Sequence, residues 1–449
     1  MARRLFGTDG VRGVAGEFLS AELTLALARA ATARVARSAA GNRPRVLVIR
    51  DTRESGEMLE AAVAAGVAAA GGLALLGGVL PTPAAPLLIG RYGFDLGVVL
   101  SASHNPFADN GVKFFGADGD KLSDAVEEEI EALLDLQPAQ PAAIGGVSQL
   151  HGTLDDYLRE LQTRFGGLDL SGRRILLDCA HGATYKAAPE IFRRLGAHID
   201  VLADAPDGRN INAGCGSTHL DQLVDAMRAG GHDAGFAFDG DGDRVLAVDG
   251  NGTVVDGDEL IALSALHLRA QGRLRGNGVA VTVMTNYGFH SAMAEAGIEV
   301  ATTNVGDRYV LEALRQRDWA FGGEQSGHIV ELGYAPSGDG IASALLTLEA
   351  LGGSALSDRQ GMEKLPQRLV NVRLPDRRAL ERAAEDAQMQ AAIVRESQLL
   401  EGRGRVLVRA SGTEPLLRVM VEAPSDDEAD AVCGRLVGQA EAAAAQPAG

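Results

Sequence analysis

The chain has 449 residues, of which 46% are hydrophobic and 23% are charged. This is the composition of an ordinary globular protein, and the length predicts several domains because one hydrophobic core rarely serves more than about 300 residues. The formal net charge of −18 argues against a nucleic-acid or anionic-membrane binder, whose footprint is basic. Three widely separated cysteines with no CxxC pair predict reduced thiols in a cytoplasmic protein, with neither disulfides nor a Cys-bound metal.

Strand-like apolar runs alternate with helical stretches from residue 45 onward, which predicts α/β layers with helices packed on buried sheets. The expected strands are 45–50, 73–76, 96–100, 175–178, 234–238 and 278–283, and the expected helices are 54–70, 184–195 and 287–296. Residues 61–80 carry no charge, but two Gly-Gly pairs interrupt them. We therefore expect a small-residue helix and a short strand there rather than a membrane span.

The last part of the chain has a different pattern. We expect a helix at 376–392, strands at 406–409 and 417–422, and a helix at 426–440, which together predict a small α+β domain. The polar linker 138–146, the end of a hairpin-like segment at 245–255 and Pro366 mark the boundaries. The predicted domains are 1–150, 151–255, 256–366 and 367–449.

The segment 236–244 reads Phe-Ala-Phe-Asp-Gly-Asp-Gly-Asp-Arg and is the most informative of the chain. Its three carboxylates, Asp239, Asp241 and Asp243, can converge on one hard cation, although Asp-Gly repeats also form plain solvated turns. The spacing argues against an EF-hand, because Arg244 stands where that loop needs Gly and Gly250 where it needs Glu. A Mg²⁺ site completed by a phosphate fits better.

The segment Ser-Ala-Ser-His-Asn-Pro at 101–106 directly follows an expected buried strand. Ligand groups of α/β sheets lie at the carboxyl ends of strands, so Ser103 beside His104 is a candidate nucleophile. The alternative is an ordinary Ser/Asn/Pro turn. Lys113 follows shortly afterwards and is either part of the same pocket or a solvated surface residue.

Three further loops carry groups suited to anions or sugars. Arg12 lies in Gly-Thr-Asp-Gly-Val-Arg-Gly, which can present a guanidinium and backbone N–H groups to a phosphate. Glu324, Ser326 and His328 lie in Gly-Gly-Glu-Gln-Ser-Gly-His and suit vicinal sugar hydroxyls. Each loop can also be read as a polar turn without function. The C-terminal domain contains a candidate phosphate cradle made of Arg409, Ser411, Gly412, Thr413 and Arg418.

Together, these loops predict a sugar-phosphate enzyme with its active site at a domain junction. The chain also resembles the α-D-phosphohexomutase superfamily over nearly its whole length. The resemblance rests on the motifs GTDGVRG, SASHNP, NGVKFF, CGSTH, DGDGDR, VGDRYV, GEQSGH and RASGTEP, in that order. Four of these motifs, SASHNP, CGSTH, VGDRYV and GEQSGH, are similar to the glucosamine branch rather than the phosphoglucomutase/phosphomannomutase branch.

The resemblance implies three related α/β domains and a C-terminal α+β domain around one cleft. It implies that Ser103 is a phosphoserine and that Asp239, Asp241 and Asp243 hold Mg²⁺ beside its phosphate. The implied reaction interconverts glucosamine 6-phosphate and glucosamine 1-phosphate through a hexosamine 1,6-bisphosphate, and it feeds UDP-N-acetylglucosamine and cell-wall synthesis. A sugar phosphate is the implied partner, and we also expect a homodimer.

The resemblance implies roles for the remaining residues. Arg244, Arg12 and Lys113 would stabilise phosphoryl oxygens, and Lys113 or His328 would serve as general acid or base. Glu324 and Ser326 would hold the sugar hydroxyls. The cradle of the last domain would bind the phosphate that does not react.

One departure and three alternatives stay open. Asn304 precedes VGDRYV where relatives often carry Lys, so affinity or selectivity can differ. The nearest alternative is a phosphoglucomutase/phosphomannomutase with the same mechanism. A phosphatase, in which water attacks the phosphoserine, and a non-enzymatic Ca²⁺ protein are the others.

Overall fold

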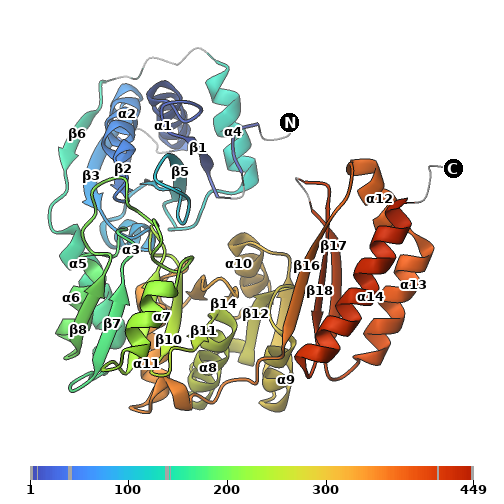
Figure 1. The fold of residues 1–449 in the computed structure, drawn as a ribbon. Helices are drawn as coiled ribbons and strands as arrows, with labels where there is room; N and C mark the ends of the chain where they lie inside the picture. Colours follow the sequence, from blue (N-terminus) through green and yellow to red (C-terminus); the bar gives the residue numbers. More distant parts are fainter. Residues whose placement is uncertain are drawn as a thin grey trace. The chain divides into compact units, whose positions relative to one another are not determined.

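The computed structural model describes residues 4–7, 9–38, 43–136, 141, 143–411 and 414–445. The chain divides into two compact units, of which the first comprises Met1–Val283 and Ala301–Gln360 and the second comprises Met284–Val300 and Gly361–Gly449. Helices cover sheets in the first unit, and a small antiparallel sheet with helices forms most of the second (Figure 1). The predicted class, α/β domains followed by a C-terminal α+β domain, is therefore confirmed.

The first sheet has the strand order β1-β5-β4-β2-β3-β6. Strands β4, β2, β3 and β6 are parallel to one another, whereas β5 runs antiparallel to both β4 and β1. The elements of this domain are β1 Val11–Val14, α1 Ala21–Ser38, β2 Arg45–Arg50, α2 Ser55–Ala69, β3 Leu73–Val79, α3 Ala84–Tyr92, β4 Leu96–Leu100, β5 Asp109–Gly116, α4 Asp124–Leu134 and β6 Gly146–Gln149.

Both faces of this sheet are buried, which explains why its central strands are continuously apolar. Val46 and Val48 of β2 belong to a core shared with α1, α2 and α4. The intervening Leu47 and Ile49 are equally buried on the opposite face, because successive side chains of a strand alternate between faces. Figure 1 shows α1 and α2 lying along this sheet. Because β2 and β4 are parallel neighbours, their carboxyl ends reach the same edge of the sheet.

The second sheet has the order β11-β10-β9-β7-β8, in which β7, β8 and β9 are parallel and β10 returns antiparallel to β9. Its elements are α5 Thr153–Phe165, β7 Arg174–Asp178, α6 Ala187–Arg194, β8 His198–Leu202, α7 Asp221–Arg228, β9 Ala234–Phe238, β10 Val245–Asp249 and β11 Val254–Val255. The hairpin-like segment expected at 245–255 is therefore a hairpin.

The third sheet has the order β13-β12-β14-β15. In it β12 and β14 are parallel, and β15 is antiparallel to β14. Its elements are α8 Gly257–Ala270, η1 Arg275–Asn277, β12 Gly278–Thr282, β13 Glu299–Thr303, α10 Asp307–Gln316, β14 Phe321–Gly323, β15 Ile329–Glu331, α11 Gly340–Leu351 and η2 Leu356–Asp358. Helix α8 begins with a capping box, in which Asp256 and Glu259 bond each other's backbone N–H groups.

The second unit contains a three-stranded antiparallel sheet, β16-β18-β17, and its own apolar core. Its elements are α9 Tyr287–Glu295, β16 Gln367–Arg373, α12 Arg377–Glu385, α13 Ala387–Leu399, β17 Arg405–Ala410, β18 Leu416–Glu422 and α14 Asp426–Ala445. The single helix expected at 376–392 is wrong. Asp386 is extended and caps α13 by accepting the Met389 N–H at 2.8 Å, so the chain breaks there.

Most other predicted elements are confirmed within a few residues, including β2, β4 and β9. Among the strands that the structure describes, β1, β5, β6, β8, β13, β14, β15 and β16 were not expected. Within the described ranges, no helix combines the length and apolarity that a membrane crossing requires. The uncharged stretch 61–80 forms the end of α2, a turn and β3, as expected.

Helices α1 and α2 approach closely at Gly66. A Cβ on Gly66 would overlap the Leu25 carbonyl oxygen of α1, whereas Gly90 of α3 has open space around it. We expect Gly66→Ala to lower the free energy of unfolding by about 1–3 kcal/mol through overpacking. Gly90→Ala, the matched control, should raise it by up to about 1 kcal/mol because Ala favours the helix. Urea unfolding of both variants checks the opposite signs, and equal effects would contradict the packing argument.

Candidate functional site

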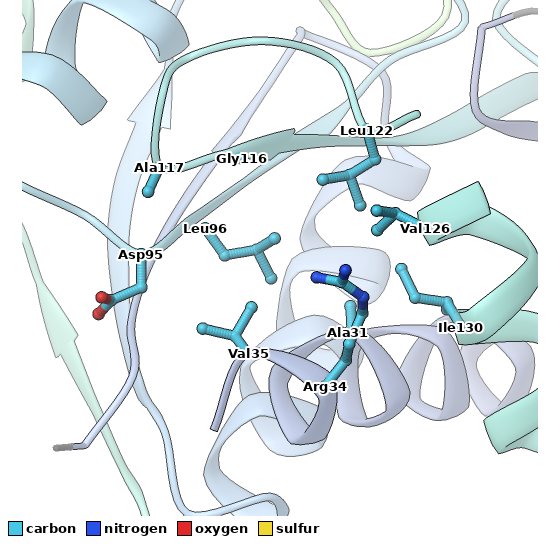
Figure 2. A pocket seen from close by; sticks show the side chains of 10 residues that line it. All are labelled: Ala31, Arg34, Val35, Asp95, Leu96, Gly116, Ala117, Leu122, Val126 and Ile130. Carbon is cyan, nitrogen blue, oxygen red and sulfur yellow. The ribbon is translucent and has the colours of Figure 1, made fainter. Parts of the chain in front are cut away.

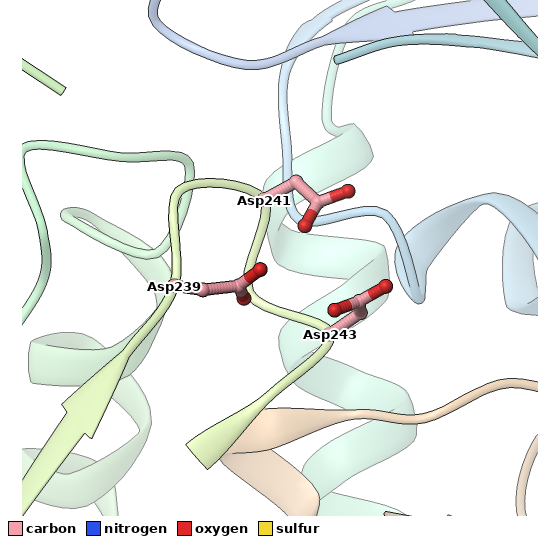
Figure 3. Close-up of side chains that lie close together, drawn as sticks. All are labelled: Asp239, Asp241 and Asp243. Atoms are coloured by element: carbon pink, nitrogen blue, oxygen red, sulfur yellow. The ribbon is translucent and has the colours of Figure 1, made fainter. Parts of the chain in front are cut away.

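The three predicted carboxylates lie on the tight loop between β9 and β10. Because Phe238 and Val245 are paired in the hairpin, the six intervening residues must turn sharply, and Gly242 has a φ of +73°. Asp239, Asp241 and Asp243 are at most 5% exposed. One oxygen from each lies within 4.8 Å of the others, and Figure 3 shows the carboxylates directed toward a shared space.

These carboxylates concentrate negative charge in a buried place. Burial, together with the charges of Asp243 and Asp241, raises the pKa of Asp239 well above its ordinary value. Burial alone would also raise the pKa of Asp243, but His328, Lys113 and Arg244 outweigh it and lower that pKa. Such a cluster is stabilised by added positive charge.

The donor set fits a hard divalent cation. All three groups offer carboxylate oxygens, the ligands that Mg²⁺ prefers, and no thiolate or imidazole belongs to the cluster. Among the described residues, Asp241 Oδ1 and Asp243 Oδ1 are buried without a hydrogen-bond partner. Unsatisfied buried acceptors are rare, and a bound cation would satisfy both.

Ser103 lies directly against this cluster. It follows β4, is 1% exposed and has a φ of +53°, which is uncommon for a non-glycine residue. Its hydroxyl donates to Asp239 Oδ2 at 2.5 Å, and His104 Nδ1 lies 3.3 Å from the Ser103 Oγ. Burial, Arg244 and Arg12 all lower the pKa of His104, so this imidazole is neutral near pH 7. The serine is thus part of a charged site rather than of a plain turn.

Lys113 of β5 belongs to the same buried cluster and is not a solvated surface residue. It is 1% exposed, and its Nζ lies 2.8 Å from Asp241 Oδ2 and 3.0 Å from Asp9 Oδ2. Burial would lower the pKa of Lys113, but the two carboxylates outweigh it and raise that pKa. Lys113 is therefore a fixed positive charge beneath the loop. Thr82 also donates to Asp241 Oδ2, at 2.6 Å.

A cavity of about 430 Å³ opens above these groups within the first unit. Six of the predicted site residues line it, and these are Arg12, His104, Asp243, Arg244, Glu324 and His328. Asp243 connects the carboxylate cluster with the open space. The cavity is large enough for a small polar ligand.

Loops of the third domain close one side of this cavity. Glu324 is 8% exposed, and its Oε1 accepts the Gly306 N–H at 2.9 Å. His328 Nδ1 lies 3.6 Å from Asp243 Oδ2, and its pKa is raised because this carboxylate outweighs the effect of burial. Ser326 is exposed on the same turn and does not line the cavity, so its expected contact with a sugar stays a prediction.

Sequence reasoning did not single out Asp9, Lys121 or Asp307 as site residues. Lys121 donates to Asp9 and, at 2.5 Å, to Asp307, so it connects the N-terminal loop with the loop before α10. Both carboxylates lie inside motifs already quoted, GTDGVRG and VGDRYV, which was the available signal. Lys121 lies in none of the quoted motifs, so only the tertiary structure identifies it.

The predicted phosphate cradle lies in the second unit. Arg409 and Arg418 are direct partners in the β17–β18 ladder, so their side chains share one face of the sheet. Within the described part of the unit, the buried Nε of Arg418 has no hydrogen-bond partner. Ser411 Oγ accepts the Glu414 N–H at 3.4 Å. Two opposed guanidinium groups favour an anion between them, while Gly412 and Thr413 lie outside the described residues.

A second cavity, of about 290 Å³, lies in the first domain between α1, α4 and the strands β4 and β5 (Figure 2). Most of its lining is aliphatic, and the lining residues include Val35, Leu96, Leu122, Val126 and Ile130. None of the predicted site residues lines it. An apolar cavity of this kind does not suit a charged sugar phosphate, so the site over the carboxylate cluster is the candidate.

The phosphoglucomutase/phosphomannomutase family matches the chain domain by domain. Its α/β/α domains I, II and III match residues 3–139, 155–252 and 256–369, and its C-terminal domain matches residues 369–439.

Known proteins of this kind are similar over the whole chain. Phosphoglucosamine mutase of Moorella thermoacetica is 48% identical over 96% of this chain and 98% of its own. A phosphoglucomutase/phosphomannomutase family protein of Burkholderia thailandensis has a TM-score of 0.82 at 23% identity, covering 99% of this chain and 98% of its own. N-acetylphosphoglucosamine mutase of Aspergillus fumigatus, solved with GlcNAc-6P and magnesium, has a TM-score of 0.67 at 18% identity, covering 99% and 96%.

The carboxylate cluster leads to a prediction for Asp239→Asn, which should change the affinity for Mg²⁺ and the free energy of unfolding in opposite directions. Asp239→Asn should lower the affinity for Mg²⁺ by at least about tenfold, because it removes one charged ligand of a hard cation. The same change should raise the free energy of unfolding of the ion-free protein at pH 7, because the folded state disfavours the ionised Asp239.

Calorimetric titration with MgCl₂ and urea unfolding in EDTA measure the two effects. Asp204→Asn, an exposed carboxylate of the same domain, is the control and should change neither. Unchanged Mg²⁺ affinity in Asp239→Asn would contradict the assignment of the cluster as a cation site.

Proposed function

We propose that this chain, which belongs to the phosphoglucosamine mutase family of isomerases, interconverts D-glucosamine 6-phosphate and D-glucosamine 1-phosphate through a phosphorylated Ser103. The observation that carries the proposal is the contact of Ser103 Oγ with Asp239 at 2.5 Å, within a buried carboxylate cluster beneath a cavity whose lining includes the basic side chains of Arg12 and Arg244. Ser103 itself does not line this cavity, but its hydroxyl lies 3.3 Å from Nδ1 of His104, which does. A hydroxyl at a strand end, in contact with a cation site and next to a cavity, can exchange a phosphoryl group with a bound sugar.

The reaction requires two transfers at the same serine. In the first, the bond between phosphorus and Ser103 Oγ breaks while a bond forms to the free hydroxyl oxygen of the sugar. The proton of that hydroxyl passes to a basic group of the site, and Ser103 Oγ takes up a proton as it leaves. The product is a hexosamine 1,6-bisphosphate. After it turns around in the site, its other phosphoryl group returns to Ser103. His328 is the candidate proton carrier, because it is buried beside the carboxylate cluster and lines the cavity. Lys113, the other candidate, holds its proton between Asp241 and Asp9 and would contribute positive charge instead.

The protein mainly positions the reactants and neutralises charge, since phosphoryl transfer needs little covalent work beyond the serine. Asp239, Asp241 and Asp243 would hold Mg²⁺, which offsets charge on the transferring phosphoryl group. Arg12 and Arg244 line the cavity and supply guanidinium groups to the phosphoryl oxygens. The magnesium in the Aspergillus fumigatus mutase supports this assignment of the ion.

The sugar and its other phosphate need separate contacts. Glu324 lines the cavity and can accept hydrogen bonds from sugar hydroxyls, with Ser326 as a further donor from the same turn. Arg409, Ser411 and Arg418, together with Gly412 and Thr413, would bind the phosphate that does not react. Because the sugar binds in two orientations, these contacts must serve either end of it.

The proposed reaction supplies glucosamine 1-phosphate to UDP-N-acetylglucosamine and hence to cell-wall synthesis. The name of the relatives, phosphoglucosamine mutase, supports the reaction on a sugar phosphate, whereas this downstream role stays a prediction. A cytoplasmic location and a homodimer stay predictions. Asn304 is exposed before α10, so its effect on selectivity also stays open to measurement.

Ser103→Ala tests the proposed nucleophile. We expect turnover to fall by at least about 10³-fold, because the proposed mechanism carries the phosphoryl group on this hydroxyl between the two transfers. The free energy of unfolding should change by no more than about 1–2 kcal/mol, since one hydrogen bond is lost. Isomerisation assays and urea unfolding measure the two effects, and substantial activity in this variant would overturn the mechanism.

Substrate preference is tested with purified protein, Mg²⁺ and a trace of hexose 1,6-bisphosphate to load Ser103. Glucosamine 6-phosphate, glucose 1-phosphate and mannose 1-phosphate are compared in parallel. A clear preference for the amino sugar supports the proposal. A preference for glucose or mannose phosphate keeps the mechanism and reassigns the substrate, and sustained release of inorganic phosphate indicates a phosphatase instead.

The cradle of the second unit makes a separate prediction. Arg418→Met should lower kcat/KM by about tenfold or more, because a charge-assisted hydrogen bond to phosphate contributes about 1.5–3 kcal/mol. Arg403→Met is the matched control, since Arg403 pairs with Glu428 on the surface of the same unit. Equal activity of the two variants would show that Arg418 does not bind the substrate.

A further inference from the structure

Arg53 is a fully buried charge outside the cavity. It lies just beyond the carboxyl end of β2, and its side chain is 0% exposed. Its Nε donates to Asp51 Oδ2 at 2.8 Å, and Asp51 is also 0% exposed. A buried ion pair of this kind costs desolvation energy and is a weak source of stability by itself. The remaining N–H groups of the guanidinium therefore need an explanation.

These N–H groups bind the backbone of the loop that carries Ser103. One terminal nitrogen donates to the carbonyl oxygens of Ser103 and Asn105, each at 2.9 Å. The other donates to the carbonyl oxygens of Pro106 and, at 2.9 Å, of Asp109. One planar, permanently charged group thus fixes four carbonyls of residues 103–109.

A second set of bonds ties the start of the loop to the same ion pair. The Ser101 hydroxyl donates to Asp51 Oδ2 at 2.6 Å and accepts the Ser103 N–H at 2.9 Å. Ser103 is therefore fixed at both its N–H and its carbonyl group. This accounts for its φ of +53°, a conformation that persists only where surrounding bonds enforce it.

The second domain contributes a matching donor. Asn212 Nδ2 donates to the carbonyl oxygens of Ser103 at 2.9 Å and Asn105 at 3.1 Å, the same two that Arg53 binds. The carboxylate loop also approaches here, because a Cβ on Gly240 would lie 2.6 Å from the Ser103 carbonyl oxygen. The position of the serine loop is thereby linked to the domain that carries the cation ligands.

We propose that Arg53 and Asn212 are positioning residues, which together form a carbonyl clamp on the Ser103 loop. The clamp returns the Ser103 hydroxyl to the same place beside Asp239 after each phosphoryl transfer. Arg53 fixes the loop within the first domain, and Asn212 aligns it with the carboxylate cluster of the second. This inference rests on the proposed role of Ser103 as the phosphoryl carrier.

Neither clamp residue lines the cavity, so their loss should act on kcat rather than on KM. Small misplacements of a reacting group cost up to about 100-fold in rate, even when their cause lies outside the chemistry. A residue that only stabilised the fold would change unfolding and leave the kinetics of the folded enzyme intact. Comparing the change in kcat with the change in the free energy of unfolding therefore distinguishes a positioning residue from one that only stabilises the fold.

The first test variant is Asn212→Gly in the full-length enzyme. Asn212 has a φ of +58°, and glycine keeps this backbone conformation while removing the donor. We expect kcat to fall about tenfold and KM to stay within about twofold. The control is Asn210→Gly, which removes an exposed amide that donates to the Ala205 carbonyl oxygen in the same segment. The control should keep both constants.

The second test compares Arg53→Lys with Arg45→Met. Lysine keeps the charge beside Asp51 but lacks the planar guanidinium fork that binds the carbonyl oxygens. We therefore expect kcat to fall in Arg53→Lys. Arg45 donates to the Tyr92 carbonyl oxygen at the opposite end of β2, and its loss should leave kcat unchanged. Urea unfolding of each variant reports its stability separately.

Mass spectrometry after incubation with hexose 1,6-bisphosphate measures phosphorylation of Ser103 in every protein. If the wild type is phosphorylated on Ser103 and Asn212→Gly keeps its kcat, the proposed clamp is wrong and the proposed function still stands. A wild type that turns over without phosphate on Ser103 overturns the proposed function itself. A phosphorylated wild type with a selective loss of kcat in Asn212→Gly supports both.

Discussion

The rest of the site depends on the burial of three carboxylates on one short hairpin loop. In a medium of low dielectric constant, three like charges within 4.8 Å repel strongly and lose their hydration. Lys113 and His328 lie against the cluster and offset part of its charge. In the proposed enzyme, a bound divalent cation would offset the remainder. The need for positive charge therefore explains why basic residues gather here in a protein whose net charge is −18.

Each part of the first unit delivers its groups to this cluster from the end of a strand. Ser103 follows β4, and Asp239 follows β9, so two separate sheets bring their carboxyl edges together. Parallel strands make this possible because all their carboxyl ends point to one edge. The third domain adds Glu324 and His328 from the turn between β14 and β15. The proposed chemistry thus arises where loops of several domains meet, while the sheets behind them remain ordinary apolar cores.

Local patterns were sufficient where a segment's own residues determine its structure. β2, β4 and β9 are short apolar runs bounded by polar turns, and both their ends were predicted to the residue. The break at Asp386 was missed, because helix propensity on both sides suggested one continuous helix. Its cause is a cap, in which Asp386 binds the Met389 N–H, and such a local competition is hard to weigh from composition.

The sequence by itself determined the α/β class, the order of the motifs, and the carboxylates, serine and basic residues that carry the proposed chemistry. These groups stand in dense motifs, where residue type and spacing already restrict the chemistry. Only the tertiary structure decided that Lys121 joins Asp9 to Asp307 and that Arg53 and Asn212 bind the same two carbonyls. Asn212 lies 109 residues from Ser103 along the chain, and such partners meet only because sheet packing brings their loops together.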